Sequence, residues 1–307
     1  MQRKTGVQWR LIAFFLVQIA LALNVSSTAY GQTNSTGGPC QVNVHWNDVE
    51  KWIWQRICAG EVADLSKYDN LKLNPRELKG WGDTRLIRST FLEDVLFHKP
   101  WAADVPRQGI RIKGALFESP VDLDNGSTVH PLWLDNSRFL ESVSLQDFKT
   151  SSYISLEGSH MLSSVNLSNA RIARELNLDG IKVLGNLDAD SMTIGSHLHM
   201  GNGIELAGVK LAGAKIGGQV IMSSIKVTGE LNMDLITIGE SLFMVDEVEL
   251  AHVRLTAAKI GVQLEIKDAK ITGHFSMDSA TIGSNLMIFE GTEFVDLRML
   301  GANIGGQ

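Results

Sequence analysis

Apolar residues recur every 22 positions over the last two-thirds of the chain. The clearest marker is an Ile-Gly pair, found at Ile194-Gly195, Ile216-Gly217, Ile238-Gly239, Ile260-Gly261, Ile282-Gly283 and Ile304-Gly305. A fixed period of this size is typical of a solenoid, in which each coil of the chain stacks on the next. Within a coil, four short segments alternate apolar and polar residues, which indicates β-strands separated by tight corners.

The inward positions of the four segments form four columns that can be followed from coil to coil. The columns run from Ile112 to Ile288, Phe117 to Phe294, Leu123 to Met299 and Thr128 to Ile304. Only the second column slips, by one residue, which a corner can absorb. The pattern predicts a mainly β protein: a right-handed, four-sided parallel β-helix of about nine coils over residues 109–307. Strands about 4.8 Å apart would make the rod about 43 Å long.

Outward positions of the second side alternate in charge. They read Lys182, Glu205, Lys226, Glu249, Lys270 and Glu293. Opposite charges would lie side by side in adjacent coils, a pairing that stabilises a sheet modestly. This ladder is either a binding surface or a solvated face suited to stacking, and the second is the simpler interpretation. The Gly after each fourth-column Ile from Ile194 onward indicates either a left-handed backbone or a place without room for a side chain.

The N-terminus is typical of a secretory signal. Basic residues precede an apolar stretch from Leu11 to Leu23, and small residues at Ala29 and Gly31 suit cleavage. We therefore expect residues 1–31 to be a signal peptide, 32–42 a flexible linker, and the protein to be exported to the periplasm or beyond. An uncleaved membrane anchor is the alternative. Loss of residues 1–29 would change the net charge from −6 to −9, which argues against a nucleic-acid partner.

Residues 43–108 lack the 22-residue period and predict a small helical unit that caps the first coil. One helix should follow Asn47 with Val49, Trp52, Ile53 and Ile57 on its apolar face. A second should begin at Asn74-Pro75, and a third should run from Asp83 to just before Pro100. The tryptophans of this unit are expected in its core, and binding of sugar or membrane is the alternative.

Candidate chemistry is sparse. Cys40 and Cys58 could pair in an exported protein, or Cys58 could remain a buried thiol. His197 and His199 form an H-x-H pair, but no further ligand is spaced to complete a metal site. No familiar catalytic motif and no cofactor site is recognisable, so we expect a protein that is not an enzyme.

Four Ala-x-Ile units carry a resemblance to a known family. Ala170-x-Ile172, Ala214-x-Ile216, Ala258-x-Ile260 and Ala302-x-Ile304 resemble the A-x-L-x-x unit of pentapeptide-repeat proteins, which form four-sided right-handed β-helices. The resemblance covers about residues 110–307. The segment 107–115 and the region before it resemble a group of uncharacterised bacterial envelope proteins, some labelled membrane-associated oxidoreductases. That label implies a redox cofactor, for which the sequence offers no site.

These observations favour a non-catalytic structural or protein-interaction module of the bacterial envelope. A β-helix enzyme or binder acting on envelope polysaccharide is an alternative, although such enzymes use longer corner loops. The oxidoreductase alternative rests on the family label alone. DNA mimicry, also known among pentapeptide-repeat proteins, would need a cytoplasmic, strongly acidic rod.

The expected interaction patch lies on outward positions of the first side and comprises Trp133, Ile221, Phe243 and Met287. Ile221 and Phe243 would be neighbours in adjacent coils. Apolar residues facing outward in register indicate an interface, so we expect a protein partner or self-association, and membrane or envelope association is also open. The sequence stops at Gln307 within a coil, which suggests either a truncated product or a bare last coil.

Overall fold

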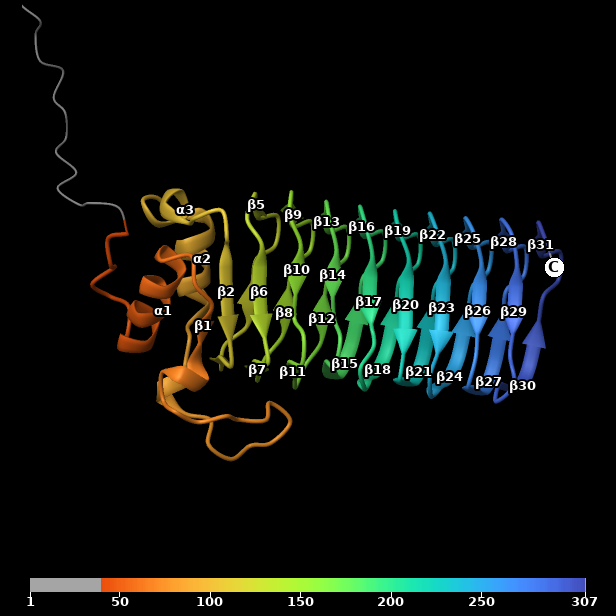
Figure 1. Cartoon of the computed structure of the whole chain (residues 1–307), viewed down its shortest axis with the longest axis horizontal. Coiled ribbons are helices and arrows are strands. Elements are labelled where there is room, and N and C mark those ends of the chain that lie inside the picture. Colours follow the sequence, from red (N-terminus) through yellow and green to blue (C-terminus); the bar gives the residue numbers. More distant parts are fainter. Residues whose placement is uncertain (1–39, 307) are drawn as a thin grey trace, which may run out of the picture. The chain divides into compact units, whose positions relative to one another are not determined.

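The computed structural model of the chain describes residues 40–306, which belong to one compact unit. The expected signal peptide, most of the expected linker, and Gln307 lie outside the described residues. Within the described part, a small group of helices lies at one end of a parallel β-solenoid of about nine coils (Figure 1). The mainly β fold, the 22-residue coil and the N-terminal helical cap are therefore confirmed.

The first and fourth sides of the solenoid are each a parallel sheet. The first side contains β2 (Ile110–Lys113), β6 (Leu132–Asp135), β10 (Ile154–Ser155), β14 (Leu176–Asn177), β17 (Leu198–Met200), β20 (Val220–Ser223), β23 (Leu242–Val245), β26 (Leu264–Ile266) and β29 (Leu286–Ile288). The fourth side contains β5 (Ser127–Thr128), β9 (Lys149–Thr150), β13 (Arg171–Ile172), β16 (Thr193–Ile194), β19 (Lys215–Ile216), β22 (Thr237–Ile238), β25 (Lys259–Ile260), β28 (Thr281–Ile282) and β31 (Asn303–Ile304). Residues 22 positions apart are partners throughout both sheets, as in Ile216 with Ile238.

The second and third sides belong to one sheet. Early coils use separate short strands, namely β3 (Leu116–Phe117), β7 (Arg138–Phe139) and β11 (His160–Met161) on the second side and β4 (Val121–Asp122), β8 (Val143–Ser144) and β12 (Val165–Asn166) on the third. From the fourth coil onward one longer strand covers both sides: β15 (Lys182–Asp188), β18 (Ile204–Lys210), β21 (Ile225–Asn232), β24 (Val248–Arg254), β27 (Ala269–Ser276) and β30 (Glu293–Arg298).

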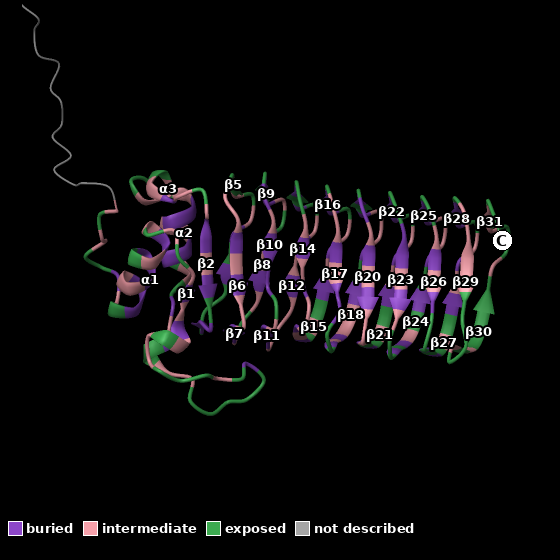
Figure 2. Ribbon diagram, in the orientation of Figure 1, coloured by how far each residue is buried: buried purple, intermediate pink, exposed green. Residues whose placement is uncertain are grey.

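The four predicted columns form the core of the rod. Met200, Met222 and Met244 of the first column are fully buried, and the other columns are buried through the eighth coil, except for Thr128 at the start of the fourth. In the last described coil the same positions are more open, and Ile288 is 44% exposed. Figure 2 shows this change from buried to exposed along the rod.

Close packing of the backbone explains the glycine that follows each fourth-column isoleucine from Ile194 onward. A Cβ atom on Gly239 would lie 2.2 Å from the carbonyl oxygen of Gly217, and one on Gly261 would lie 2.1 Å from that of Gly239. Neither residue has a positive φ. Of the two explanations that the sequence left open, lack of room for a side chain is therefore the correct one.

Left-handed backbone occurs instead at two corners of the coil, between the first and second sides and between the third and fourth sides. The corner between the third and fourth sides is the more regular. Positive φ values recur between the third and fourth sides at Asn125, Asp147, Asn169, Ser191, Gly213, Leu235, Ala257, Ser279 and Gly301. Glycine and small polar residues adopt this conformation at low cost. Leu235, with a φ of 59° and a side chain 65% exposed, carries the strain without gaining packing in return.

The cap begins with α1 (Asp48–Cys58), which the sequence predicted at its correct start. Asn47 accepts a hydrogen bond from the Glu50 amide, and the Glu50 carboxylate accepts one from the Asn47 amide. This capping box satisfies two backbone donors at the helix start. Trp54 of this helix is fully buried. Trp52, which was expected on the buried face, is only partly buried and lies against Tyr68.

Backbone pairing joins the cap to the first coil. The short strand β1 (Ala63–Asp64) extends the first side by pairing with β2, and Leu86 bridges to Leu116 on the second side. The remaining elements are the 3₁₀ turns η1 (Leu65–Lys67) and η2 (Asp83–Arg85) and the helices α2 (Ser89–Phe97) and α3 (Trp101–Asp104). The cap therefore covers strand edges of the first coil that would otherwise have unpaired backbone groups.

Two predicted helices are wrong in part. Asn74 begins a turn rather than a helix: its side chain accepts from the Arg76 amide, and no apolar period follows to hold a helix on the core. The third helix starts at Ser89 instead of Asp83 because the intervening Ile87 amide donates to Leu116 of the first coil. Tertiary pairing here overrides the helical pattern in the sequence.

The register predicts opposite outcomes for two neighbouring substitutions. Ile238 is 1% exposed, whereas Thr237 is exposed between Lys215 and Lys259 of the adjacent coils. Ile238→Asp should cost more than the about 2–5 kcal/mol of a large-to-small core change, because it also buries an unpaired charge. Thr237→Asp should change the free energy of unfolding by less than about 0.5 kcal/mol. Equal melting of the two variants by circular dichroism would contradict the register.

Leu235 offers a test of the left-handed corner. Leu235→Asn should raise the free energy of unfolding by about 1 kcal/mol, because asparagine adopts this conformation more readily. Leu235→Ala is the control: it removes the same exposed side chain but keeps the strain, so it should be close to neutral. Urea denaturation of the three proteins distinguishes these outcomes, and equal gains from both substitutions would rule out backbone strain as the cause.

Candidate functional site

The outward row of the first side contains all four residues of the expected interaction patch but does not bring them together. Ile221 and Phe243 are direct partners in β20 and β23 and are partly exposed. Glu265 separates Phe243 from Met287, and three polar positions separate Ile221 from Trp133. The continuous part of the predicted patch is therefore the pair Ile221 and Phe243.

Trp133 belongs to a separate cluster near the cap. The Arg111 guanidinium lies 5.3 Å from the centre of its ring, and the Tyr153 ring lies 5.8 Å away. Arg111 also donates to the Gly60 carbonyl oxygen at the end of α1. These contacts tie the first two coils to the cap, so the main role of Trp133 is packing at this junction.

Alternate coils differ in the number of residues between the inward position of the second side and that of the third. Three residues separate the inward Val227 from Leu231 in β21, but only two separate Leu250 from Val253 in β24. The same alternation occurs between β15 and β18. A coil with the shorter stretch has one more residue at the corner that precedes its second side. Each coil thus keeps 22 residues while the surface changes with a period of 44.

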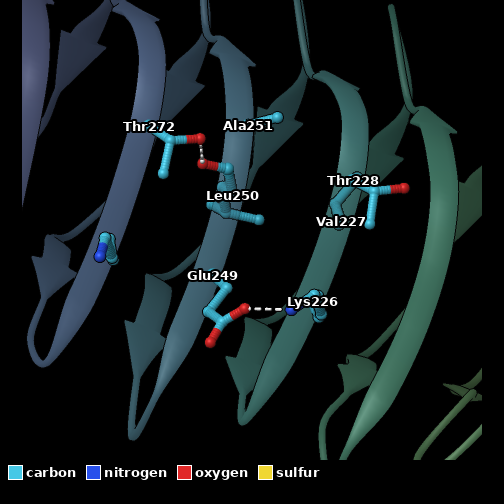
Figure 3. A pocket seen from close by; sticks show the side chains of 8 residues that line it. Lys226, Val227, Thr228, Glu249, Leu250, Ala251 and Thr272 are labelled. Atoms are coloured by element: carbon cyan, nitrogen blue, oxygen red, sulfur yellow. Dashed lines mark hydrogen bonds and ion pairs between the residues drawn. The ribbon is translucent and has the colours of Figure 1, made fainter.

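Two hollows form where a short stretch lies between two longer ones. The first, about 260 Å³, lies over β18 and has Ala207 in its lining, and the second, about 350 Å³, lies over β24 with Ala251 at the equivalent position. Lys226 and Thr228 line both. Figure 3 shows the second hollow on three adjacent strands.

The predicted charge ladder runs beside the hollows. Lys182 is 2.6 Å from Glu205, and Lys226 is 2.5 Å from Glu249. The hydrogen bond from Lys182 lowers the pKa of Glu205, and that from Lys226 lowers the pKa of Glu249. Both carboxylates are therefore ionised at neutral pH and are already paired with a cation of the protein.

A loop of the cap reaches the first end of this ladder. Arg76 is 2.6 Å from Glu205 and donates 2.7 Å to the Gly203 carbonyl oxygen. The preceding Pro75 carbonyl oxygen accepts from Arg138 at 2.5 Å and lies 3.0 Å from His160 Nδ1. Burial lowers the pKa of His160, so the ring is neutral in this contact at neutral pH. The loop, orange in Figure 1, thus fastens the cap to the second, third and fifth coils.

The structure also places the other candidates. Cys40 and Cys58 form a disulfide that ties the start of the described chain to α1. His197 accepts from the Gln219 amide of the next coil, and its ring packs edge-on against His199. Among residues 40–306, no three His, Cys, Asp or Glu side chains converge to hold a metal, and no helix has the length and apolarity to cross a membrane.

Comparisons with protein-family models, with curated proteins and with solved structures find no match to this chain. Interpretation of the surfaces therefore depends on their own geometry and chemistry.

The hollows were not predicted from the sequence, although two signals for them were present. The second column slips by one residue at alternate coils, at Leu206 and Leu250. Glycines recur with the same 44-residue period at Gly185, Gly229 and Gly273. Together these signals indicate that alternate coils differ in shape where the second side meets the third.

Asp135 provides a pH-dependent test of the corner between the first and second sides. Its carboxylate accepts from the Ser155 hydroxyl at 2.6 Å and from the Glu157 amide at 3.1 Å. Burial outweighs these hydrogen bonds and raises the pKa of Asp135 to about 6. The folded state thus holds the proton more tightly than the unfolded state, and stability should fall as pH rises from about 4 to about 6.

Asp135→Asn should remove this loss, because the amide oxygen can accept the same hydrogen bonds without a charge. Above pH 6 the variant should be more stable than the wild type by up to about 3 kcal/mol, and below pH 4 the two should be nearly equal. Denaturation at a series of pH values measures the difference. A stability difference that does not depend on pH would contradict the burial of a charged carboxylate.

Proposed function

We propose that this chain is a non-catalytic protein-interaction module of the bacterial cell envelope, in which the rod presents the Ile221–Phe243 pair to a protein partner. The main support for this proposal is that these two large apolar side chains are neighbours on the outward face of the first side and are partly exposed. Apolar groups of this size in register favour association, since contact removes them from water.

Export is the second part of the proposal. The signal-like N-terminus supports it, and so does the disulfide between Cys40 and Cys58, because disulfides persist mainly in oxidising compartments. We also propose that the chain is a pentapeptide-repeat protein, which the Ala-x-Ile units and the four-sided solenoid support. No observation on residues 40–306 favours the oxidoreductase alternative, and we do not propose it.

In purified protein the available partner is a second copy, so the proposal predicts reversible self-association. Removing an apolar anchor from an interface costs about 2 kcal/mol or more, and Ile221→Ser with Phe243→Ser should weaken association at least about thirtyfold. Sedimentation velocity over a range of concentrations measures the change. Thr193→Ser with Thr237→Ser, on the fourth side, is the matched control and should leave association unchanged.

A second apolar surface requires its own variant. In the last described coil Leu297 and Leu300 are 39% and 63% exposed. If Leu297→Ser with Leu300→Ser abolishes association while the Ile221 and Phe243 variant keeps it, the first side is not the interface. A wild-type protein that stays monomeric at all concentrations would also count against the proposal.

A further inference from the structure

We propose that the two hollows beside the charge ladder form one groove that binds an extended, neutral β-1,4-linked glycan lying along the rod. The groove is a different surface from the Ile221–Phe243 pair, so this site goes beyond the interaction module proposed above. Polysaccharide binding was an alternative function considered from the sequence, and the groove is the surface on which we propose that it occurs.

The spacing of the hollows is the first argument. They are related by 44 residues, or two coils, which corresponds to about 9.6 Å along the rod. A linear polymer with the same repeat would meet the same side chains at each hollow. Successive sugars of an extended β-1,4-linked chain alternate in orientation, so its repeating unit is a disaccharide, and the length of that unit is close to the spacing of the hollows.

Peptides fit this spacing less well. An extended peptide repeats its side-chain direction about every 6.6 Å, which falls out of step with the hollows after one repeat. A polyproline helix repeats about every 9.3 Å, but the grooves that bind it are lined by aromatic side chains. None of the residues lining the two hollows is aromatic.

The chemistry of the lining is the second argument. The Lys226–Glu249 pair supplies both donors and acceptors at one edge of the second hollow, and the hydroxyl of Thr272, which donates to the Leu250 carbonyl oxygen, adds a further acceptor. Sugar hydroxyls likewise donate and accept. Lys270 also lines this hollow, but along the ladder it lies between Glu249 and Glu293. Lysines and glutamates therefore balance along the row, which does not select for a charged ligand. Ala251 lies among these groups and presents only a methyl group, which can contact the apolar face of a sugar ring.

The continuity of the groove is the third argument. Lys226 and Thr228 line both hollows, so a ligand passing from one to the other stays in contact with the protein. Since β18, β21 and β24 form an uninterrupted parallel sheet beneath them, no corner loop crosses the path. A tetrasaccharide or longer chain can therefore occupy both hollows at once.

Titration calorimetry with defined oligosaccharides tests the proposal. Cellohexaose and N-acetylated chitohexaose are the probes, and maltohexaose, which is α-linked and coiled, is the control ligand. We expect at least one β-1,4-linked hexasaccharide to bind at least about tenfold more tightly than its disaccharide, because only the longer chain engages both hollows. Maltohexaose should bind at least about tenfold more weakly than that hexasaccharide.

Variants locate the site. Ala207→Ile with Ala251→Ile places a bulky side chain in each hollow and should weaken hexasaccharide binding at least about tenfold. Thr193→Ile with Thr237→Ile introduces the same side chain at the same 44-residue separation on the fourth side and should have no effect. Lys226→Ala, at an exposed side chain shared by both hollows, should also weaken binding and is not expected to disturb the fold.

Failure of both β-1,4-linked probes to bind would overturn the proposal. Equal binding of maltohexaose, or wild-type binding by the Ala207 and Ala251 variant with its fold intact by circular dichroism, would overturn it as well. If that double variant does not fold, Lys226→Ala decides, and unchanged binding there contradicts the assignment of the groove.

Discussion

Direct stacking of equivalent residues, 22 positions apart, is the constraint on which the structure depends. The backbone amide of Gly239 donates to Ile216 and that of Gly261 to Ile238, each at 2.8 Å, and the same bond recurs from coil to coil. Each side chain therefore has the equivalent residue of the next coil as a neighbour about 4.8 Å away, and the two must be compatible in size and charge. The glycines at 22-residue spacing from Gly195 to Gly305 show how strict this is, because a Cβ on any of them would overlap the carbonyl oxygen of the coil before it.

The same constraint shapes the surface. Like charges in adjacent coils would repel each other, so Lys226 is placed between Glu205 and Glu249. Alternation of lysine and glutamate doubles the chemical repeat to two coils. The alternation in length between β21 and β24 doubles the geometric repeat in the same way. Charge and shape thus share a 44-residue period, which gives the groove its repeating character.

Features that follow from the period could be predicted from the sequence, and features that depend on contacts outside it could not. The inward columns and the adjacency of Ile221 and Phe243 follow from counting residues. The start of the last long helix of the cap could not be found by counting residues. The apolar pattern predicts that Leu86 and Ile87 are helical, but Leu86 forms a β-bridge with Leu116 of the first coil and the Ile87 amide donates to it instead. The loop at Pro75 is likewise held by Arg138, whose partner no local pattern reveals.

The central claim, an unbroken 22-residue register along the rod, can be measured as a distance between spin labels at Ser127 and Thr281. Both residues are exposed on the fourth side and lie seven coils apart, and the two native cysteines are joined to each other. Electron paramagnetic resonance should give one narrow separation of about 34 Å between backbone positions, after allowance for the label linkers. A separation that differs by more than one coil spacing, or a broad distribution, would contradict the register.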